Sequence, residues 1–334
     1  MGFGLLNMHP LFTSSFRIKI LQLSIIIAIP ALIVLVYVEA GLNRLDTHYL
    51  SKKINFESQL SEIEILSLGS SNAYFGINPQ GFSCKGYNLA YNAQSMYYDL
   101  EFIQKYINSM PKLKVVILPA IFYTTGSRLV STSQDWRIFF YNQYWGLPLE
   151  NEPKNLTGNI KRHIDSRNYS KIALYSDTLY HHVRDGFSGN VDYVPEKNGW
   201  YNSKDAPKLV ISNEVGRRGA ESQSLSYSHE ISKENIAYWQ EIISILKKRS
   251  VQVILVHLPE EGSYYNFLDK NKSVEFTKNI TELALKNNIK FADYSRDQRF
   301  DQSDYTFMPD HLNDKGALKF SEMFDKEYLN NMCK

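Results

Sequence analysis

The stretch "LSLGSSNAYFGINP", Leu66 to Pro79, decides the fold. It opens with apolar residues that end at Leu68 and then breaks into Gly-Ser-Ser-Asn before an aromatic pair. A buried strand that stops at a glycine and continues into two serines can be an ordinary turn. It can equally present a nucleophile at the carboxyl end of a strand, where open α/β sheets place their active sites. The rest of the chain has to distinguish these two interpretations.

Further short apolar segments alternate with helical patterns along the chain. The expected strands are 63–69, 86–90, 114–120, 251–259 and 289–295, and the expected helices are 97–110, 234–250, 274–288 and 314–329. Strands that alternate with helices of about 10–15 residues indicate a parallel sheet with helices on both faces. We therefore predict an α/β domain, although the alternation does not give the order of its strands.

The composition limits the classes of function. A length of 334 residues with 43% hydrophobic residues allows a sizeable core, as one large domain or two small ones. The net charge of +2 argues against a nucleic-acid partner, which needs a concentrated basic surface. The 23 tyrosines suggest aromatic surfaces on which sugars stack, but tyrosine is also common in strands.

Cysteine and histidine usage predicts neither a metal site nor a cofactor. Cys84 and Cys333 are the two cysteines, and no C-x-x-C or zinc-ligand spacing occurs. The two cysteines either pair, which would fix the C-terminal segment, or are both free. His181 and His182 are expected at the surface, because no third ligand is near them in the sequence.

A membrane segment is expected near the N-terminus. Ile20 to Val38, "ILQLSIIIAIPALIVLVYV", holds 19 positions without a charge, which at 1.5 Å per residue nearly crosses a hydrocarbon core of about 30 Å. We predict a tail at 1–17, a retained transmembrane signal anchor at 18–40, a connector at 41–62 and the α/β domain at 63–334. A cleaved signal peptide is the alternative, because Val38-Glu39-Ala40 satisfies the small-residue cleavage rule.

The orientation of that anchor rests on a few charges. Arg17 and Lys19 at its amino end favour a cytoplasmic N-terminus and an extracytoplasmic C-terminal domain, periplasmic or at the cell surface. Arg44, Lys52 and Lys53 follow on the far side, so the opposite orientation stays open as the weaker alternative.

A polar insertion at about 124–232 interrupts the alternation. It is rich in Asn, Ser, Tyr and charged residues and has too many aromatic residues for simple disorder. We expect it to lie at the catalytic edge of the sheet, as a lid or a substrate platform, or else to be a long loop region without a role in catalysis.

Two segments could supply a nucleophile and its base. Ser70 and Ser71 follow the first strand, and His311 lies in "FMPDHLNDKGA" just before the last helix. A serine becomes a good nucleophile only when a base takes its proton, and a carboxylate that fixes the imidazole tautomer completes such a unit. In a parallel α/β sheet both segments reach the same carboxyl-end rim, so we expect them to meet.

The segments "LGSSN" and "PDHLNDKGA" resemble the SGNH (GDSL-like) hydrolase superfamily. The resemblance is greatest to its membrane-anchored branch that acts on cell-envelope polymers, which includes the D-alanine transfer protein of teichoic acids and alginate acetylation proteins. It covers about 63–329 without the insertion, and it implies a flavodoxin-like three-layer sandwich with a parallel sheet.

The resemblance also assigns residues. Gly69-Ser70-Ser71 stands where the family has Gly-Asp-Ser, which makes Ser71 the nucleophile, and His311 matches the base. "NLAYNAQS", 88–95, resembles the block N-x-x-x-x-G-x-S/T, whose glycine N–H helps to bind the oxyanion. Ala93 replaces that glycine and still offers an N–H if its backbone adopts the same angle.

The sequence departs from the family pattern in two places. The oxyanion-binding Asn expected after the third strand is missing from "PAIFYTTG", and we consider Asn72 or Asn92 as substitutes. Met308 stands where the family has its acid. Asp310 is then the nearest carboxylate to His311, but a residue rarely reaches the ring of its own neighbour.

Two further candidates remain around this site. A backbone carbonyl or Asp304 is the alternative to Asp310 for orienting His311. His257, in "VILVHLP", ends the fourth strand and either points to the core or rim or contacts the substrate.

Two functional hypotheses follow. The first is a membrane-anchored extracytoplasmic serine esterase or O-acyltransferase that acts on a cell-surface glycan or glycan precursor. By family analogy, its partner for transfer would be a membrane acyltransferase that supplies the acyl group. The second is a catalytically degenerate SGNH-like domain that binds glycan or scaffolds an envelope assembly, as the two departures would suggest.

Overall fold

The computed structural model describes residues 14–45, 47–152, 154–187, 195–202, 212–306 and 308–333. The chain forms two compact units, and each is described by itself. The smaller consists of 1–45 with 169–189, and the larger of 46–168 with 190–334.

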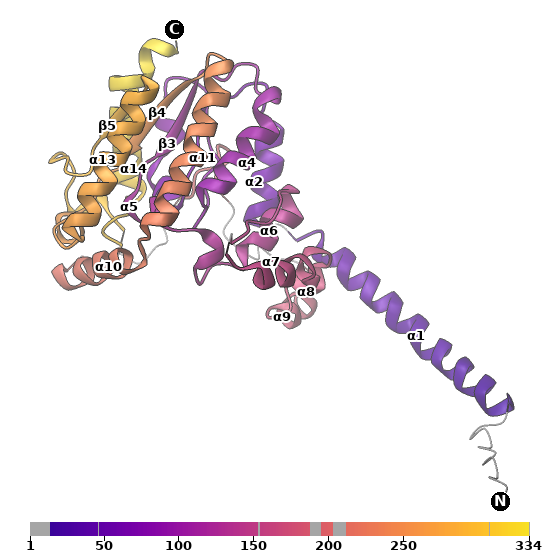
Figure 1. Ribbon diagram of the computed structural model, residues 1–334. Helices are drawn as coiled ribbons and strands as arrows, with labels where there is room; N and C mark the ends of the chain where they lie inside the picture. The colour runs from indigo at the N-terminus through magenta and orange to yellow at the C-terminus, as the bar shows by residue number, and fades with distance from the viewer. Residues whose placement is uncertain are drawn as a thin grey trace, which may run out of the picture. The chain divides into compact units, whose positions relative to one another are not determined.

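The larger unit is built on a parallel sheet of five strands, as predicted (Figure 1). The strands are β1 (Ile65–Ser67), β2 (Gly86–Asn88), β3 (Val115–Pro119), β4 (Gln252–His257) and β5 (Lys290–Asp293). Their order is β2-β1-β3-β4-β5, which is the flavodoxin-like order with a topological switch point between β1 and β3. The fold class expected from the sequence is therefore confirmed.

Helices cover both faces of this sheet. On one face, α3 (Ser71–Gly76) and α14 (Asp314–Phe324) pack together, and Tyr74, Phe320 and Phe324 bury their rings in a core with alternate strand residues such as Ile65, Ile117 and Ile254. On the other face, α4 (Met96–Tyr106), α11 (His229–Lys248) and α13 (Lys270–Asn287) lie side by side in front of the strands (Figure 1). Alternate residues of a strand point to opposite faces, so both helix layers close over apolar side chains.

The main helices begin at side-chain caps. Ser228, Asp269 and Asn313 each accept a backbone N–H of the first turn of α11, α13 and α14. Such caps satisfy N–H groups that lack an acceptor within the helix, and each stabilises the helix by about 1 kcal/mol.

The expected connector contains a helix that belongs to the larger unit. Thr47 caps α2 (His48–Glu57), and Lys52 on this helix is fully buried. Its ammonium group donates to the carbonyl of Ala90 and lies 4.5 Å and 4.4 Å from the ring centres of Tyr74 and Tyr91. Burial holds the pKa of Lys52 well below its usual range.

The insertion is largely helical where the structure describes it. Its helices in the larger unit include α6 (Arg137–Trp145), α7 (Leu156–His163) and α10 (Asn213–Ser226), and α5 (Phe122–Thr125) spans its start. The remaining short elements of the larger unit are η1 (Pro79–Gly81), η2 (Ile107–Ser109), η3 (Leu129–Ser131), η4 (Ser166–Asn168), α12 (Gly262–Tyr265), η5 (Gln302–Asp304), η6 (Asp325–Leu329) and η7 (Asn330–Met332). Within the larger unit, Asn88 N donates to Asn198 O at 2.8 Å, so the insertion also contacts the edge strand β2.

Cys84 and Cys333 form a disulfide, with their Cα atoms 5.3 Å apart. Of the two alternatives left open by the sequence, the structure therefore contains the paired state. The bond joins the segment that precedes β2 to the end of the described chain.

The smaller unit contains α1 (Ser14–Leu42), α8 (Lys171–Leu174) and α9 (Leu179–Arg184). Residues Ile18–Leu42 are long and apolar enough to span a membrane, with a mean hydropathy of 2.6 and no burial within the protein. Near the end of α1, the Glu39 carboxylate accepts the backbone N–H groups of Lys171 and Ile172 at 2.7 Å and 3.1 Å. An anionic side chain thus meets the first N–H groups of α8, which is a favourable place for it.

Candidate active site

The turn after β1 places Ser71 at the first position of α3. Gly69 has a φ of +109°, which L residues rarely adopt, and a Cβ there would lie 3.1 Å from two ring atoms of Pro119 on β3. The chain therefore needs glycine at this point to turn sharply from strand to helix. Ser71 is half-buried at the carboxyl end of β1, beside the switch point of the sheet.

Ser71, His311 and Asp310 form a continuous hydrogen-bonded relay. Ser71 Oγ lies 2.7 Å from His311 Nε2, and His311 Nδ1 lies 2.7 Å from Asp310 Oδ1. The side chains of His311 and Asp310 are only 6% and 7% exposed, so the two polar groups meet away from bulk water. An imidazole held in this way can take a proton from the serine while the carboxylate stabilises the imidazolium that forms.

A tight turn allows Asp310 to reach the ring of its own neighbour. His311 N donates to Met308 O at 3.0 Å, and Thr306 N donates to His311 O at 2.8 Å. In addition, the Asn72 side-chain amide donates to Asp310 O at 2.6 Å, which fastens this turn to α3. An adjacent carboxylate rarely reaches the ring of its neighbour, but this turn makes the contact possible for Asp310, the nearest candidate acid in the sequence.

Asp304, the alternative acid, is engaged elsewhere. Its carboxylate lies 2.9 Å from Lys315 Nζ and 2.7 Å from Lys319 Nζ, both on α14. Burial raises the pKa of Asp304, but its hydrogen bonds with the two lysines outweigh this effect, so the net direction is downward. Asp304 therefore anchors the loop before α14, and Asp310 is the acid at the imidazole.

The insertion contributes Gln223, a residue that the sequence analysis did not single out. Gln223 Nε2 donates to Asp310 Oδ2 at 3.0 Å, and Tyr264 OH donates to Gln223 Oε1. Burial raises the pKa of Asp310, but the charge and hydrogen bond of His311 and the bond from Gln223 outweigh it, so this pKa lies below its usual value. No motif marks Gln223 in the sequence, because it lies on a polar helix of the insertion.

Ala93 adopts the backbone conformation that its proposed role requires. Its φ is +57°, in the left-handed region that favours glycine. Tyr91 N donates to Gly69 O at 3.2 Å, which places this loop beside the Ser71 turn. Within the described residues, neither Ser71 N–H nor Ala93 N–H donates a hydrogen bond. Both N–H groups are therefore available to bind a developing oxyanion.

Asp99 ties the two turns together and is a second residue that the sequence analysis missed. Its Oδ1 accepts both Gly69 N–H at 3.0 Å and Gln94 Nε2 at 2.6 Å. Burial raises the pKa of Asp99 to about 7, although these two hydrogen bonds lower it. The signal in the sequence is an acid on the apolar face of the first turn of α4, where the helix dipole favours a negative charge.

The two candidate oxyanion amides differ in their surroundings. The Asn72 amide nitrogen is committed to Asp310 O. The side-chain oxygen of Asn92 is buried and accepts no hydrogen bond within the described residues. In the segment after β3 that lacks the expected Asn, Thr124 Oγ1 lies 2.9 Å from the hydroxyl of Ser70, not of Ser71.

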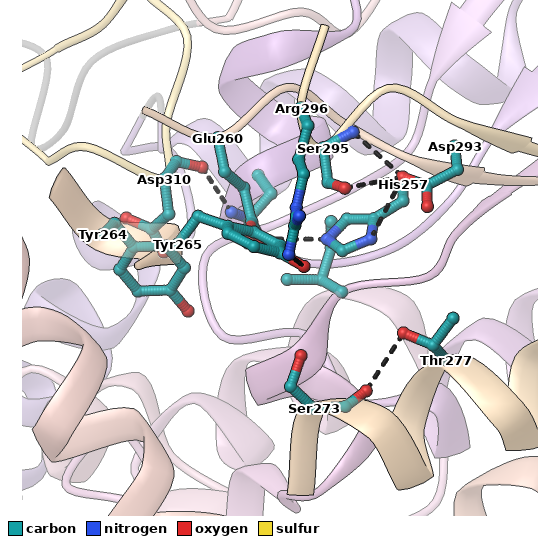
Figure 2. A network of polar contacts seen from close by, with 12 residues as sticks. His257, Glu260, Tyr264, Tyr265, Ser273, Thr277, Asp293, Ser295, Arg296 and Asp310 are labelled. Atoms are coloured by element: carbon teal, nitrogen blue, oxygen red, sulfur yellow. Dashed lines mark hydrogen bonds and ion pairs between the residues drawn. The ribbon is translucent and has the colours of Figure 1, made fainter. Parts of the chain in front are cut away.

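His257 belongs to a different cluster (Figure 2). Its Nε2 lies 3.0 Å from Glu260 Oε1, and its Nδ1 lies 3.6 Å from Asp293 Oδ1. Burial lowers the pKa of His257, but the two carboxylates raise it more, so the net direction is upward. The structure records no contact between His257 and Ser71 among the described residues, so it does not bring His257 into the relay.

Aromatic rings adjoin the relay. The Phe75 ring meets the His311 ring edge to face with centroids 5.6 Å apart, and the Tyr201 ring of the insertion lies 5.0 Å from Phe75.

No cluster of three or more His, Cys, Asp or Glu that could hold a metal ion occurs in the part of the chain that the structure describes.

No protein-family profile and no curated protein matches the chain. Among solved structures, one with some similarity is a proposed acylhydrolase from Bacteroides fragilis NCTC 9343. It is 12% identical to this chain, with a TM-score of 0.39, and the match covers 83% of this chain and 94% of the acylhydrolase chain. A GDSL-like lipase from Bacteroides thetaiotaomicron VPI-5482 has 10% identity, a TM-score of 0.39, and coverage of 85% and 99%.

A third solved structure, described as a proposed platelet activating factor from Streptococcus pneumonia, has 13% identity and a TM-score of 0.38, with coverage of 95% of this chain and 100% of its own. At these identities and TM-scores, the similarity assigns neither a family nor an activity to the chain.

Proposed function

We propose that this protein is a membrane-anchored serine esterase or O-acyltransferase of the SGNH class that removes or transfers acyl groups on a cell-surface glycan. The observation that carries the proposal is the relay in which Ser71 Oγ and Asp310 Oδ1 each lie 2.7 Å from a nitrogen of the same imidazole. Serine, histidine and aspartate in this order are the unit that activates a serine hydroxyl for acyl transfer.

The reaction begins when Ser71 Oγ attacks the acyl carbonyl and its proton passes to His311 Nε2. The tetrahedral oxyanion then accepts hydrogen bonds from the Ser71 and Ala93 N–H groups. Collapse of this intermediate breaks the ester bond, and the leaving alcohol takes the proton from His311. Water or a sugar hydroxyl next attacks the acyl-Ser71 ester, again with His311 as base, and restores the free serine.

Two features, α1 and the disulfide, support the cellular location that we propose for the enzyme. A largely apolar helical segment of 25 residues supports a membrane anchor. A bond between Cys84 and Cys333 supports a larger unit that lies outside the cytoplasm, because disulfides persist in oxidising compartments. A surface glycan or a lipid-linked precursor is the substrate class that such a tethered enzyme would meet, and a membrane acyltransferase would be its acyl donor in the transfer reaction.

The test is labelling of the full-length protein in detergent micelles with a fluorophosphonate probe, which reacts with activated serines. We expect labelling of the wild type and its loss in Ser71→Ala and in His311→Ala. Ser70→Ala is the matched control, since Ser70 Oγ bonds to Thr124 and to Asn72 and not to His311. A folded wild-type protein that takes no label would contradict the proposal.

The alternative function is a glycan-binding or scaffold domain without catalysis. The observation that favours it is the absence of an Asn from "PAIFYTTG" after β3, where the family has its oxyanion-binding Asn, because loss of one such donor typically costs about 10²–10³ in rate. The same labelling experiment separates the two functions, since a scaffold domain needs no activated serine.

A further inference from the structure

A cleft with two lobes lies at the carboxyl ends of β4 and β5. The lobes have volumes of about 250 Å³ and 370 Å³. Tyr265, Ser295, Arg296 and Asp297 line both lobes. The Arg296 guanidinium stacks on the Tyr265 ring at 3.7 Å, and Figure 2 shows both side chains in the same cluster as Glu260 and His257. Each lobe has about the size of a single small polar ligand.

Glu260 is the unusual residue of this cleft. Its side chain is only 1% exposed, and it lines the smaller lobe. One of its oxygens, Oε1, pairs with His257 at 3.0 Å, whereas Oε2 is buried without a hydrogen-bond partner among the described residues. A buried carboxylate oxygen without a donor costs about 1–3 kcal/mol or more. A ligand that donates a hydrogen bond to Oε2 would remove this cost.

The other acids of the smaller lobe already have donors. Glu261 accepts Ser263 N–H at 2.7 Å, Asp301 accepts Ser303 N–H at 2.8 Å, and Asp297 accepts Arg299 N–H at 2.9 Å. Glu260 in turn has His257 beside it to balance its charge. Arg296 on the lobe wall and Arg299, which pairs with Asp297, also offset part of the negative charge. The acceptor that lacks a donor is Glu260 Oε2, and an uncharged hydroxyl group can satisfy it.

The cleft adjoins the catalytic turn. Tyr264 OH donates a hydrogen bond to Gln223, and Gln223 in turn donates one to Asp310. Glu261 N donates to Pro309 O at 2.8 Å. Tyr305, which lines the smaller lobe, lies directly before Thr306, whose N–H bonds to His311 O. A ligand in the smaller lobe would thus contact the same segments that hold the catalytic acid.

We propose that this cleft binds a neutral sugar residue, one of whose hydroxyl groups donates a hydrogen bond to Glu260 Oε2. Arg296 supplies hydrogen-bond donors to the ring or hydroxyl oxygens, and Tyr265 supplies an aromatic edge. The inference deepens the proposed function, because it rests on that function for a glycan as substrate and assigns the recognition of the glycan to residues outside the relay.

The experiment is saturation-transfer NMR and calorimetric titration of the full-length protein with methyl glycosides of glucose, galactose and N-acetylglucosamine. The micelles must be of a detergent without a sugar headgroup. Glu260→Gln is the main variant, and Arg296→Ala is a second one because the exposed Arg296 can be removed without disturbing the core. The matched control is Glu282→Gln, whose exposed side chain lies on α13.

We expect wild type and Glu282→Gln to bind at least one neutral glycoside with the same affinity. Glu260→Gln should weaken binding about 10–100-fold, which is the usual value of a hydrogen bond to a charged group. Arg296→Ala should weaken binding about 3–10-fold through the loss of its donors. Absence of glycoside binding to the wild type, preference for glucosamine or Mg²⁺ over neutral glycosides, or unchanged affinity in either folded variant would overturn the inference.

Failure of this inference is distinguishable from failure of the proposed function. Fluorophosphonate labelling of Ser71 requires no sugar, so labelled wild-type protein that binds no glycoside would refute the sugar cleft alone. Unlabelled wild-type protein whose glycoside binding depends on Glu260 would refute the esterase and retain the sugar cleft.

Discussion

His311 and His257 are two buried histidines at the carboxyl edge of one sheet, and they differ in their partners. His311 has an acid on Nδ1 and a serine hydroxyl on Nε2. His257 has a carboxylate at each nitrogen, Asp293 at 3.6 Å and Glu260 at 3.0 Å. Burial of a histidine with a carboxylate is therefore insufficient to define a base. A base also needs one nitrogen directed at a hydroxyl group that it can deprotonate.

The largest expected difference between the two histidines is in catalysis. Ser71→Ala and His311→Ala should each lower kcat for a small ester such as p-nitrophenyl acetate about 10⁴–10⁶-fold, as in other serine relays. Steady-state kinetics with the full-length protein would measure this. Glu282→Gln, which changes an exposed side chain on α13, should retain the wild-type rate. An active Ser71→Ala protein would show that another group catalyses the hydrolysis.

Removal of the charge on Asp310 should have the next largest effect. Asp310→Asn should keep the fold but lower kcat about 10³–10⁴-fold, because an amide favours the wrong tautomer of His311. The measurement is kcat over pH, together with the crystal structure of the variant. A loss smaller than tenfold would mean that the short contact between Asp310 and His311 in the ground state does not stabilise the imidazolium.

The His257 cluster should instead respond in stability. His257→Gln removes the partner of the buried Glu260 carboxylate, which should cost about 3 kcal/mol because that acid is left buried and unpaired. Urea unfolding of wild type and variant would measure the difference in the free energy of unfolding. A variant as stable as the wild type would show that the contact between His257 and Glu260 does not stabilise the fold, and the comparison with His311 would have to be revised.

Asp99 extends the comparison to a buried acid whose described partners include no histidine. Its pKa is raised to about 7 from an ordinary 3.8, whereas that of Asp310 is lowered. Asp99 therefore loses its proton at a lower pH in the unfolded state than in the folded state. As the pH rises from about 4 to 7, this difference lowers the free energy of unfolding. The advantage of Asp99→Asn over the wild type in free energy of unfolding should therefore grow by about 2–4 kcal/mol between pH 5 and pH 8.

Urea unfolding of the wild type and Asp99→Asn at both pH values would measure this gain. An Asn side-chain oxygen can still accept from Gly69 and Gln94, so activity should stay measurable. A stability difference that does not change with pH would contradict the raised pKa.

The smallest expected effect concerns the second oxygen of Asp310. Gln223→Ala removes one hydrogen bond to a charged group, so kcat should fall about tenfold with KM nearly unchanged. Steady-state kinetics would measure both constants. The matched control is Ser222→Ala, which changes the neighbouring position of the same helix and leaves the bond from Gln223 to Asp310 in place. Equal rates in both variants would show that the hydrogen bond from Gln223 to Asp310 does not contribute to catalysis.

Much of the fold was predictable because its signals are local. The apolar runs that became β1 to β5 are short, bounded by turn residues and separated by helical patterns, and each of the five forms a strand. The strand order was not predictable from this alternation, since it depends on which strands pair across the sheet. The helix α1 was expected from 19 uncharged positions.

The site was predictable in part, for a related reason. The motifs placed Ser71 and His311, and the structure brings them together. The reach of Asp310 depends on a turn closed by hydrogen bonds from Asn72 and Thr306, which residue spacing does not specify. Gln223 acts through a contact between segments that are distant in sequence, so a motif could not identify it. The sign of Asp99 in the sequence was an acid on the apolar face of α4, which gave no indication of its contact with Gly69.

The disulfide has a consequence for the order of events in biosynthesis. It joins Cys84 to Cys333 across 249 residues, so the partner of the first thiol is made only after all five strands. If the larger unit matures outside the cytoplasm, Cys84 stays reduced until nearly the whole unit has been exported. Its pairing with Cys333 would then report that all five strands have been exported, and a chain arrested earlier would be recognisable by its free Cys84 thiol.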